Sequence, residues 1–217
     1  KGKLAQQITQ VPGSAVLTTT PVDSTVEQRA VASPQFEIDR RNFAADLLRT
    51  GRMSPARADS IAFFAVREAY IRGIPPAVIF GVMLTENAVF VSDASSSVGA
   101  VGLMQIYPKI WLRELGSRFG RDLTSDSTNL KYGTYILAEY IKPRRGAKTP
   151  SPADVRKGLL RYNGCVRGTN TPNCRNYPDK VKRYVEREAE SMCGGRDFYQ
   201  CIARPFMVGL LGRDPGD

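Results

Sequence analysis

The 217-residue sequence contains no histidine, and this absence excludes several kinds of catalytic site. Without histidine the chain cannot form a Ser-His-Asp or Cys-His relay, nor the HExxH zinc site of metalloproteases. Proton transfer near neutral pH must therefore rely on a carboxylate, lysine, tyrosine or cysteine with a displaced pKa. A single glutamate with a raised pKa is the simplest of these choices.

The sequence also has no run of about 18 apolar residues, so no segment is expected to span a bilayer. It begins at Lys1 rather than at methionine, which suggests a processed or truncated chain with a signal peptide or membrane anchor outside it. The content of 42% hydrophobic and 24% charged residues is typical of a globular protein that can bury a core. We expect one domain with a tail, and a monomer.

The net charge of +10 indicates attraction to a polyanion, such as nucleic acid, an anionic membrane surface or a cell-wall polymer. The lysines and arginines are scattered along the chain rather than gathered in one arm. No helix-turn-helix, RNP or zinc-finger spacing is present. The sequence therefore argues against a nucleic-acid partner, although charge alone does not choose between the other two.

Four cysteines, Cys165, Cys174, Cys193 and Cys201, form two locally spaced pairs near the C-terminus. Three disulfide pairings are formally possible, and the spacing favours 165 with 174 and 193 with 201. Zinc binding or free thiols are the alternatives, but neither pair has the CxxC spacing of common structural zinc sites. We expect two disulfides, no metal, and an oxidising compartment such as the periplasm or the cell exterior.

Residues 1–35 are rich in Thr, Val, Ser, Gln and Pro and show no sustained helical pattern, which predicts an extended tail or linker. Residues 36–217 are predicted to form the folded domain, because helical signals recur from Phe36 onward. No long alternating pattern predicts a strand, so the domain should be mainly α. The predicted helices cover residues 42–50, 56–72, 76–90, 108–115, 129–141, 152–162, 178–191 and 197–211, with a capping box at Ser151 and Asp154.

Glu86 lies on the apolar stripe of the helix that begins at Pro75-Pro76, after Val82 and Met83. Burial of a carboxylate favours its protonated form, and the negative end of the helix dipole acts in the same direction. A neutral carboxylic acid could donate a proton to a glycosidic oxygen. The alternative is a glutamate at the edge of the stripe that reaches water or pairs with an arginine, and the helix alone does not decide between the two.

Four short motifs follow one another after this point. They are Glu86-Asn87, S-S-V-G-A-V-G-L-M-Q-I-Y-P at residues 96–108, R-Y-N-G at 161–164, and N-Y-P-D-K-V at 176–181. Taken alone, the glycine-broken segment 96–108 is typical of an ordinary corner between helices. In order and spacing, however, the four motifs resemble the lytic transglycosylase domain of the soluble type, which is related in fold to goose-type lysozyme. The resemblance covers roughly residues 75–187.

The resemblance implies a lysozyme-like helical domain with a long cleft that holds a peptidoglycan strand, and no cofactor. Glu86 matches the family's catalytic acid and base, which cleaves the β-1,4 bond after N-acetylmuramic acid and leaves a 1,6-anhydromuramyl end without consuming water. The substrate's N-acetyl group is thought to stabilise the reacting centre, so that one carboxylate suffices. The candidate substrate-binding residues are Ser96, Gln105, Tyr107, Tyr162, Asn163 and Tyr177.

The sequence departs from the family pattern at two of these positions. Asn87 stands where serine usually follows the glutamate, and Tyr107 stands where methionine is common. Ordinary glycosidases need a second acid, and Asp93 lies seven residues after Glu86. The alternatives to a lytic transglycosylase are a muramidase that uses water and a glycan-binding protein of an envelope-spanning machine. The expected location is the periplasm or cell envelope, with a secreted or phage-borne protein as the alternative.

Overall fold

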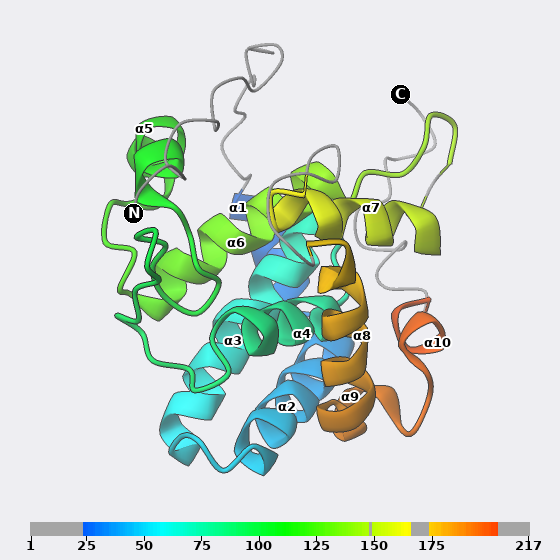
Figure 1. The fold of residues 1–217 in the computed structure, drawn as a ribbon. Coiled ribbons are helices and arrows are strands. Elements are labelled where there is room, and N and C mark those ends of the chain that lie inside the picture. The colour runs from blue at the N-terminus through cyan, green and yellow to red at the C-terminus, as the bar shows by residue number, and fades with distance from the viewer. Residues whose placement is uncertain (1–23, 148, 166–173, 204–217) are drawn as a thin grey trace.

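The computed structural model describes residues 24–147, 149–165 and 174–203, and this part of the chain is mainly helical, as the sequence predicts (Figure 1). Its only pairings of extended backbone are two isolated bridges, which join Ser95 to Val101 and Val101 to Ile106. The helices are α1 (Ser24–Val31), α2 (Pro34–Arg49), α3 (Pro55–Arg72), α4 (Pro76–Glu86), α5 (Pro108–Phe119), α6 (Asp126–Tyr140), α7 (Pro152–Tyr162), the 3-10 turn η1 (Cys174–Asn176), α8 (Tyr177–Glu188), α9 (Glu190–Cys193) and α10 (Phe198–Ile202).

Helix α4 is the central helix of the fold. Every residue from Pro76 to Leu84 is buried, so the helix is enclosed on all sides rather than along one apolar stripe. A helix that is apolar all round belongs in a core, which corrects the amphipathic pattern expected from the sequence. The helix ends at Glu86, because Asn87 leaves the helical conformation with φ −147°. Glu86 therefore stands where the core meets the surface.

Helix α8 packs closely against α4 because Gly81 has no side chain. A Cβ atom at Gly81 would lie 2.6 Å from Cγ2 of Val185 and 2.9 Å from Cγ1 of Val181. Tyr177, the first residue of α8, bonds to Glu86, the last residue of α4, so the two helices run in opposite directions. This packing brings the start of α8 to the end of α4.

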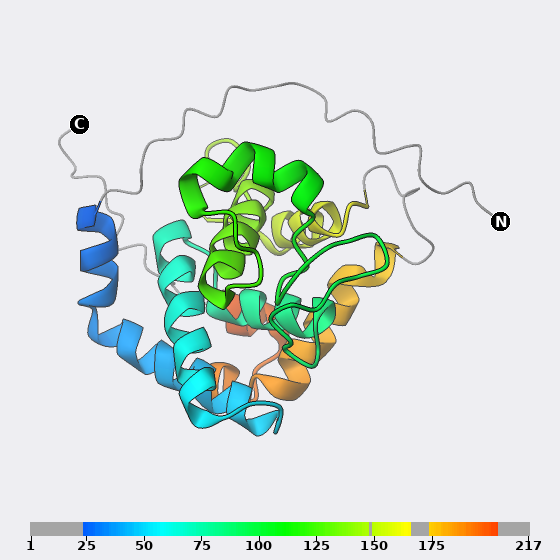
Figure 2. The same cartoon turned by 90° about the vertical axis from the view of Figure 1, so that its left-hand side faces the viewer.

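Helices α2 and α3 pack against α4, and α6 packs against α3. Ser54 caps α3 by accepting a hydrogen bond from the backbone N–H of Arg57, and Gly73 ends α3 in the left-handed conformation. α3 contacts both α2 and α6, and the rings of Phe43 and Phe80 join α2 to α4 edge to face. Figure 2 shows α1 and α2 following one another along the edge of the domain. These helices form the scaffold that holds the end of α4 in place.

Residues 1–35 were predicted to form an extended tail, and the structure corrects this prediction for the last part of the segment. Residues 24–31 form α1 and α2 begins at Pro34, whereas residues 1–23 lie outside the described residues. Ala30 and Phe36 are buried, and the Phe36 ring meets Tyr70 edge to face. Two isolated apolar residues are too few to produce a visible stripe in a Thr- and Ser-rich segment.

The other helix predictions agree with the structure to varying degrees. The predictions for α3 and α7 are confirmed to within one residue, and the capping box of α7 at Ser151 and Asp154 is present. The predicted helix 178–191 is two helices, because Ala189 breaks the helical backbone between α8 and α9. Of the predicted helix 197–211, residues 198–202 form α10 and residues 204–211 lie outside the described residues.

Two disulfides and one buried carboxylate tie the C-terminal segments to the domain. The disulfides join Cys165 to Cys174 and Cys193 to Cys201, the pairs that the spacing favours. Asp46 on α2 accepts hydrogen bonds from the backbone N–H groups that begin α9. Within the described ranges, no helix is both long enough and apolar enough to cross a membrane.

Candidate active site

The segment after Glu86 is fixed by the residue that follows it. Asn87 is buried, and its Nδ2 donates to the carbonyl oxygens of Val91 (2.7 Å) and Gly102 (3.2 Å). Its Oδ1 accepts from the N–H of Val91 at 3.2 Å. A buried amide that satisfies three backbone groups holds the loop rather than a ligand. The departure from serine at this position is thus explained by a structural role.

Arg57 anchors the same loop to the scaffold. Its Nη2 donates to the carbonyl oxygen of Phe90 at 2.5 Å and to Oγ of Ser92 at 2.9 Å. It also forms an ion pair with Asp126 at the start of α6, with Nη2 3.3 Å from Oδ2. Arg57 therefore joins α3, α6 and the loop that follows Glu86.

Asn129 on α6 clamps the second half of the loop. Its side chain is 1% exposed; Nδ2 donates to the carbonyl oxygens of Val101 and Leu123, both at 2.9 Å, and Oδ1 accepts from the N–H of Met104 at 2.8 Å. A Cβ atom at Gly102 would lie 2.2 Å from that Nδ2, and its φ of +84° also favours glycine. The sequence analysis did not identify Asn129, since a lone asparagine in a helix carries no motif.

The carboxyl group of Glu86 meets the hydroxyl of Tyr177, which donates to Oε1 at 2.5 Å. Glu86 keeps some exposed surface, but burial of its carboxyl group is the largest influence on its pKa and raises it to about 7. The hydrogen bond from Tyr177 and the charge of Lys180 act in the opposite direction. Burial outweighs both, so the group is an acid that titrates near neutral pH.

Tyr162 lies beside this pair. Its hydroxyl donates to the carbonyl oxygen of Met104 at 2.8 Å, and its charge interaction with Glu86 contributes to a raised pKa. Burial is the main reason that the pKa values of Tyr162 and Tyr177 lie well above that of free tyrosine. Both hydroxyls therefore stay protonated and act as hydrogen-bond donors. The structure brings Glu86, Tyr162 and Tyr177 together.

Ser96 and Gln105 lie in the loop and bond to its own backbone. Oγ of Ser96 accepts from the N–H of Ala100 at 3.0 Å. Nε2 of Gln105 donates to the carbonyl oxygens of Gly102 at 2.9 Å and Ala94 at 3.2 Å. Gln105 has a φ of +48°, which is uncommon for a residue other than glycine and marks a constrained position.

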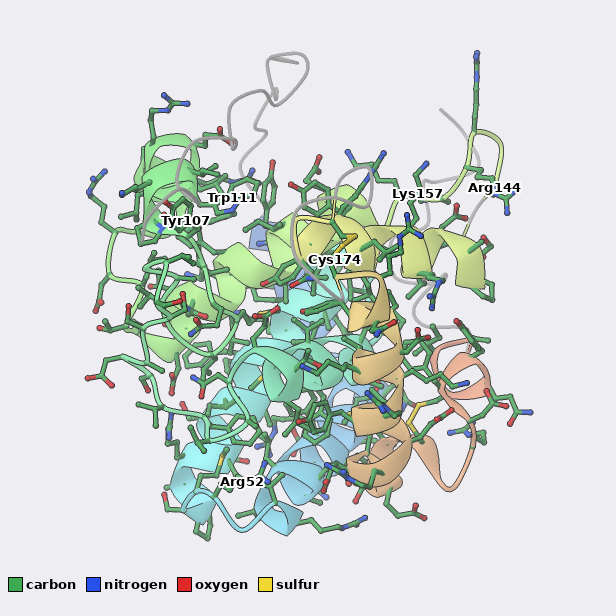
Figure 3. All side chains as sticks on the ribbon, in the orientation of Figure 1. Arg52, Tyr107, Trp111, Arg144, Lys157 and Cys174 are labelled. Atoms are coloured by element: carbon green, nitrogen blue, oxygen red, sulfur yellow. A yellow bond between two sulfur atoms is a disulfide. The ribbon has the colours of Figure 1, made fainter. Side chains whose placement is uncertain are left out.

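Asn163 and Tyr107 occupy helix ends. Asn163 is half-buried and ends α7 directly after Tyr162, and Tyr107 is half-buried and precedes α5. Figure 3 shows Tyr107 at the start of α5, Trp111 on α5, and Cys174 where α7 and α8 meet. The side chains of Tyr107 and Asn163 form no hydrogen bond with other described residues, so neither is hydrogen-bonded to Glu86, whose partner is Tyr177.

Asp93, the candidate second acid, is exposed, and it is not among the groups that act on the pKa of Glu86. In the part of the chain that the structure describes, no three His, Cys, Asp or Glu side chains gather as a metal site would require. The site is thus built around one carboxyl group, two tyrosines and a loop held by three polar side chains, those of Asn87, Arg57 and Asn129.

Comparison with known proteins gives this arrangement a family. A search of curated proteins found no match to the chain. A family model described as the transglycosylase SLT domain matches residues 64–180, which contain Glu86, the loop, and both tyrosines. The match spans more than half of the chain and agrees with the mainly helical, lysozyme-like architecture. Proteins with this domain act on peptidoglycan, outside the cytoplasm, as lytic transglycosylases. The chain belongs to the transglycosylase SLT domain family.

Proposed function

We propose that this protein is a lytic transglycosylase in which Glu86 is the sole general acid and base. It cleaves the β-1,4 bond between N-acetylmuramic acid and N-acetylglucosamine and forms 1,6-anhydromuramyl ends. The observation that carries the proposal is the Glu86 carboxyl group, which is buried and has a pKa of about 7. A group with this pKa can give and take a proton near neutral pH, which is what one residue acting twice must do.

In the first step, protonated Glu86 donates its proton to the glycosidic oxygen. Tyr177 donates a hydrogen bond to Oε1, which leaves Oε2 to carry the acidic proton toward the substrate. The bond between C1 of the muramic acid and the leaving oxygen breaks, and positive charge develops at C1. The substrate's N-acetyl group stabilises the positive charge at C1. The mechanism therefore needs no second carboxylate beside C1, the role that Asp93 was considered for.

In the second step, the Glu86 carboxylate removes the proton from the C6 hydroxyl of the same muramic acid unit. O6 then bonds to C1 and closes the 1,6-anhydro ring, while Glu86 regains its proton. The hydrogen bond from Tyr177 stabilises the carboxylate that exists between the two steps. The hydroxyl of Tyr162, held by the carbonyl of Met104, is a further fixed polar group beside the reacting sugar.

The substrate-binding roles of Ser96, Gln105, Tyr107 and Asn163 belong to the same proposal. Ser96 and Gln105 lie in the loop that follows Glu86, Asn163 directly follows Tyr162 and Tyr107 precedes α5, and these positions support the proposed roles. The periplasm or cell envelope is the proposed location. It is supported by the two disulfides, which persist in oxidising compartments, and by the location of peptidoglycan.

The reducing ends of the products test the proposal. Digested peptidoglycan is treated with borohydride, which reduces ordinary sugar ends but not 1,6-anhydro ends. We expect the new ends to resist reduction. If each cleaved glycosidic bond yields one reducible end, the protein is a muramidase. If the wild type cleaves no bonds, the result favours a binding protein.

Activity should depend on pH through the ionisation of Glu86. The first step needs the protonated acid, so kcat/KM is expected to fall as pH rises above about 7, the pKa of Glu86. The measurement is the initial rate of release of soluble muropeptides between pH 5 and 9 at low substrate. A profile that stays flat through this range would contradict the assignment of Glu86 as the acid.

Substitution of Tyr177 by phenylalanine should move this profile. Tyr177 lowers the pKa of Glu86 by hydrogen bonding, so Tyr177→Phe is expected to raise that pKa and shift the fall in kcat/KM to higher pH. The matched control is Tyr162→Phe, which loses the bond to Met104 but no bond to Glu86. Equal shifts in both variants would show that Tyr177 does not act through its hydrogen bond.

A further inference from the structure

Lys180 stands beside the candidate acid on helix α8. It follows Tyr177 by three residues, and residues three apart lie on the same side of a helix. Because Tyr177 donates its hydroxyl to Glu86, that side of α8 faces the end of α4. Lys180 is exposed, and its charge acts on the Glu86 carboxyl group. Its ammonium group is therefore both close to the acid and open to solvent.

Two other cations of α8, Lys182 and Arg187, have carboxylate partners, whereas Lys180, like Arg183 further along the helix, forms no ion pair among the described residues. Lys182 forms an ion pair with Glu186 at 3.8 Å, and Arg187 forms one with Glu188 at 2.8 Å. The carboxylate closest to Lys180 in sequence, Asp179, is taken by Arg156 at 2.7 Å. Lys180 thus presents an uncompensated positive charge at the site.

This charge does not assist the acid. The positive charge of Lys180 lowers the pKa of Glu86 and so opposes the effect of burial, which keeps Glu86 protonated. A substrate carboxylate bound to Lys180 would offset the positive charge of Lys180, so that burial would determine the pKa of Glu86. The sugar rings of a peptidoglycan strand are neutral, and its anionic groups are the carboxylates of the peptides attached to muramic acid.

We propose that Lys180 binds a carboxylate of the peptide carried by the muramic acid unit next to Glu86. This inference rests on the proposed function and deepens it, since it names the part of the substrate that α8 recognises. Lys180 would select peptide-bearing strands over bare glycan and would fix the register of the muramic acid at the acid.

The test measures binding without turnover, in protein that carries Glu86→Gln. Its probes are purified peptidoglycan strands and the same strands with their carboxylates converted to amides. Lys180→Met is expected to weaken binding to the native strands about fivefold, the effect of one partly exposed ion pair, and to leave binding to the amidated strands unchanged. Lys180→Arg should retain the native affinity because it keeps the charge.

Arg187→Met is the matched control. Arg187 lies on the same side of α8 about 10 Å further along the helix, so its loss should not affect binding. Four results would each overturn the proposal. Arg187→Met could lose as much affinity as Lys180→Met, or Lys180→Met could lose as much affinity for amidated strands as for native strands. Alternatively, Lys180→Met could keep the full affinity, or native strands could fail to bind at all. Because cleavage is assayed separately with the wild type, a protein that binds through Lys180 but does not cut would instead disprove the proposed function.

Discussion

Replacement of Glu86 by glutamine is expected to reduce the turnover of peptidoglycan by about 10² to 10⁴-fold, the range that general acid-base catalysis contributes. Glutamine keeps the size of the side chain and an oxygen that can accept the hydroxyl of Tyr177, but it has no acidic proton to transfer to the substrate. Since the proposed mechanism uses Glu86 in both steps, no other group can replace it. The measurement is the initial rate of muropeptide release by the variant and the wild type.

Stability separates loss of the acid from loss of the fold. The pKa of Glu86 is raised from 4.5 to about 7, so the stability contributed by its protonated carboxyl group is fully present below pH 4.5 and is lost as pH rises through 7. Glu86→Gln does not ionise and should therefore unfold at a higher temperature than the wild type at pH 8. Glu190 is exposed, and Glu190→Gln is the control, which should change neither the rate of muropeptide release nor the unfolding temperature. A folded Glu86→Gln protein with full activity would refute the assignment.

Replacement of Asn129 by alanine is expected to lower the free energy of unfolding by about 2 to 3 kcal/mol. The N–H of Met104 and the carbonyl of Leu123 lose their partner at about 1 kcal/mol or more each, whereas the carbonyl of Val101 keeps the N–H of Ile106. The loop that Asn129 holds contains Met104, whose carbonyl oxygen accepts the hydroxyl of Tyr162. Activity should therefore fall as well, even at temperatures where the variant stays folded. Urea unfolding and muropeptide release measure the two effects.

Asn176→Ala is the control for this prediction. Asn176 is exposed and precedes α8 without a side-chain cap bond, so its loss should change the stability by less than about 0.5 kcal/mol. Asn129→Asp keeps the acceptor for Met104 but turns a buried oxygen toward the carbonyls of Val101 and Leu123 in place of the donor, and should be at least as destabilised as the alanine variant. Stability of Asn129→Ala equal to that of the wild type would contradict the role of Asn129 as a clamp.

The sequence predicted the elements whose signals are local. Proline, serine and glycine mark the ends of α3 and the start of α7, where capping requires particular residue types. Glu86 could be proposed as the acid because the absence of histidine narrowed the choice and four motifs surround it in order. The match to the SLT family over residues 64–180 agrees with that resemblance.

The features that the sequence did not reveal depend on contacts between distant segments. Asn129 bonds to residues 25 to 28 positions away, and the hydroxyl of Tyr177 reaches Glu86 across 91 residues. The unpaired charge of Lys180 could be recognised only from the structure, which shows the ion-pair partners of the neighbouring residues. Helix α1 was missed for a related reason, since it packs mainly against α3, a helix further along the chain.

Digestion of peptidoglycan in water enriched in oxygen-18 tests the central claim most directly. The account predicts that mass spectrometry will find products lighter by one water than ordinary reducing-end muropeptides, with no heavy oxygen incorporated, because the C6 hydroxyl closes the ring. Glu86→Gln should give no such products. Incorporation of one heavy oxygen at each new end by the wild type would contradict the account and identify the reaction as hydrolysis.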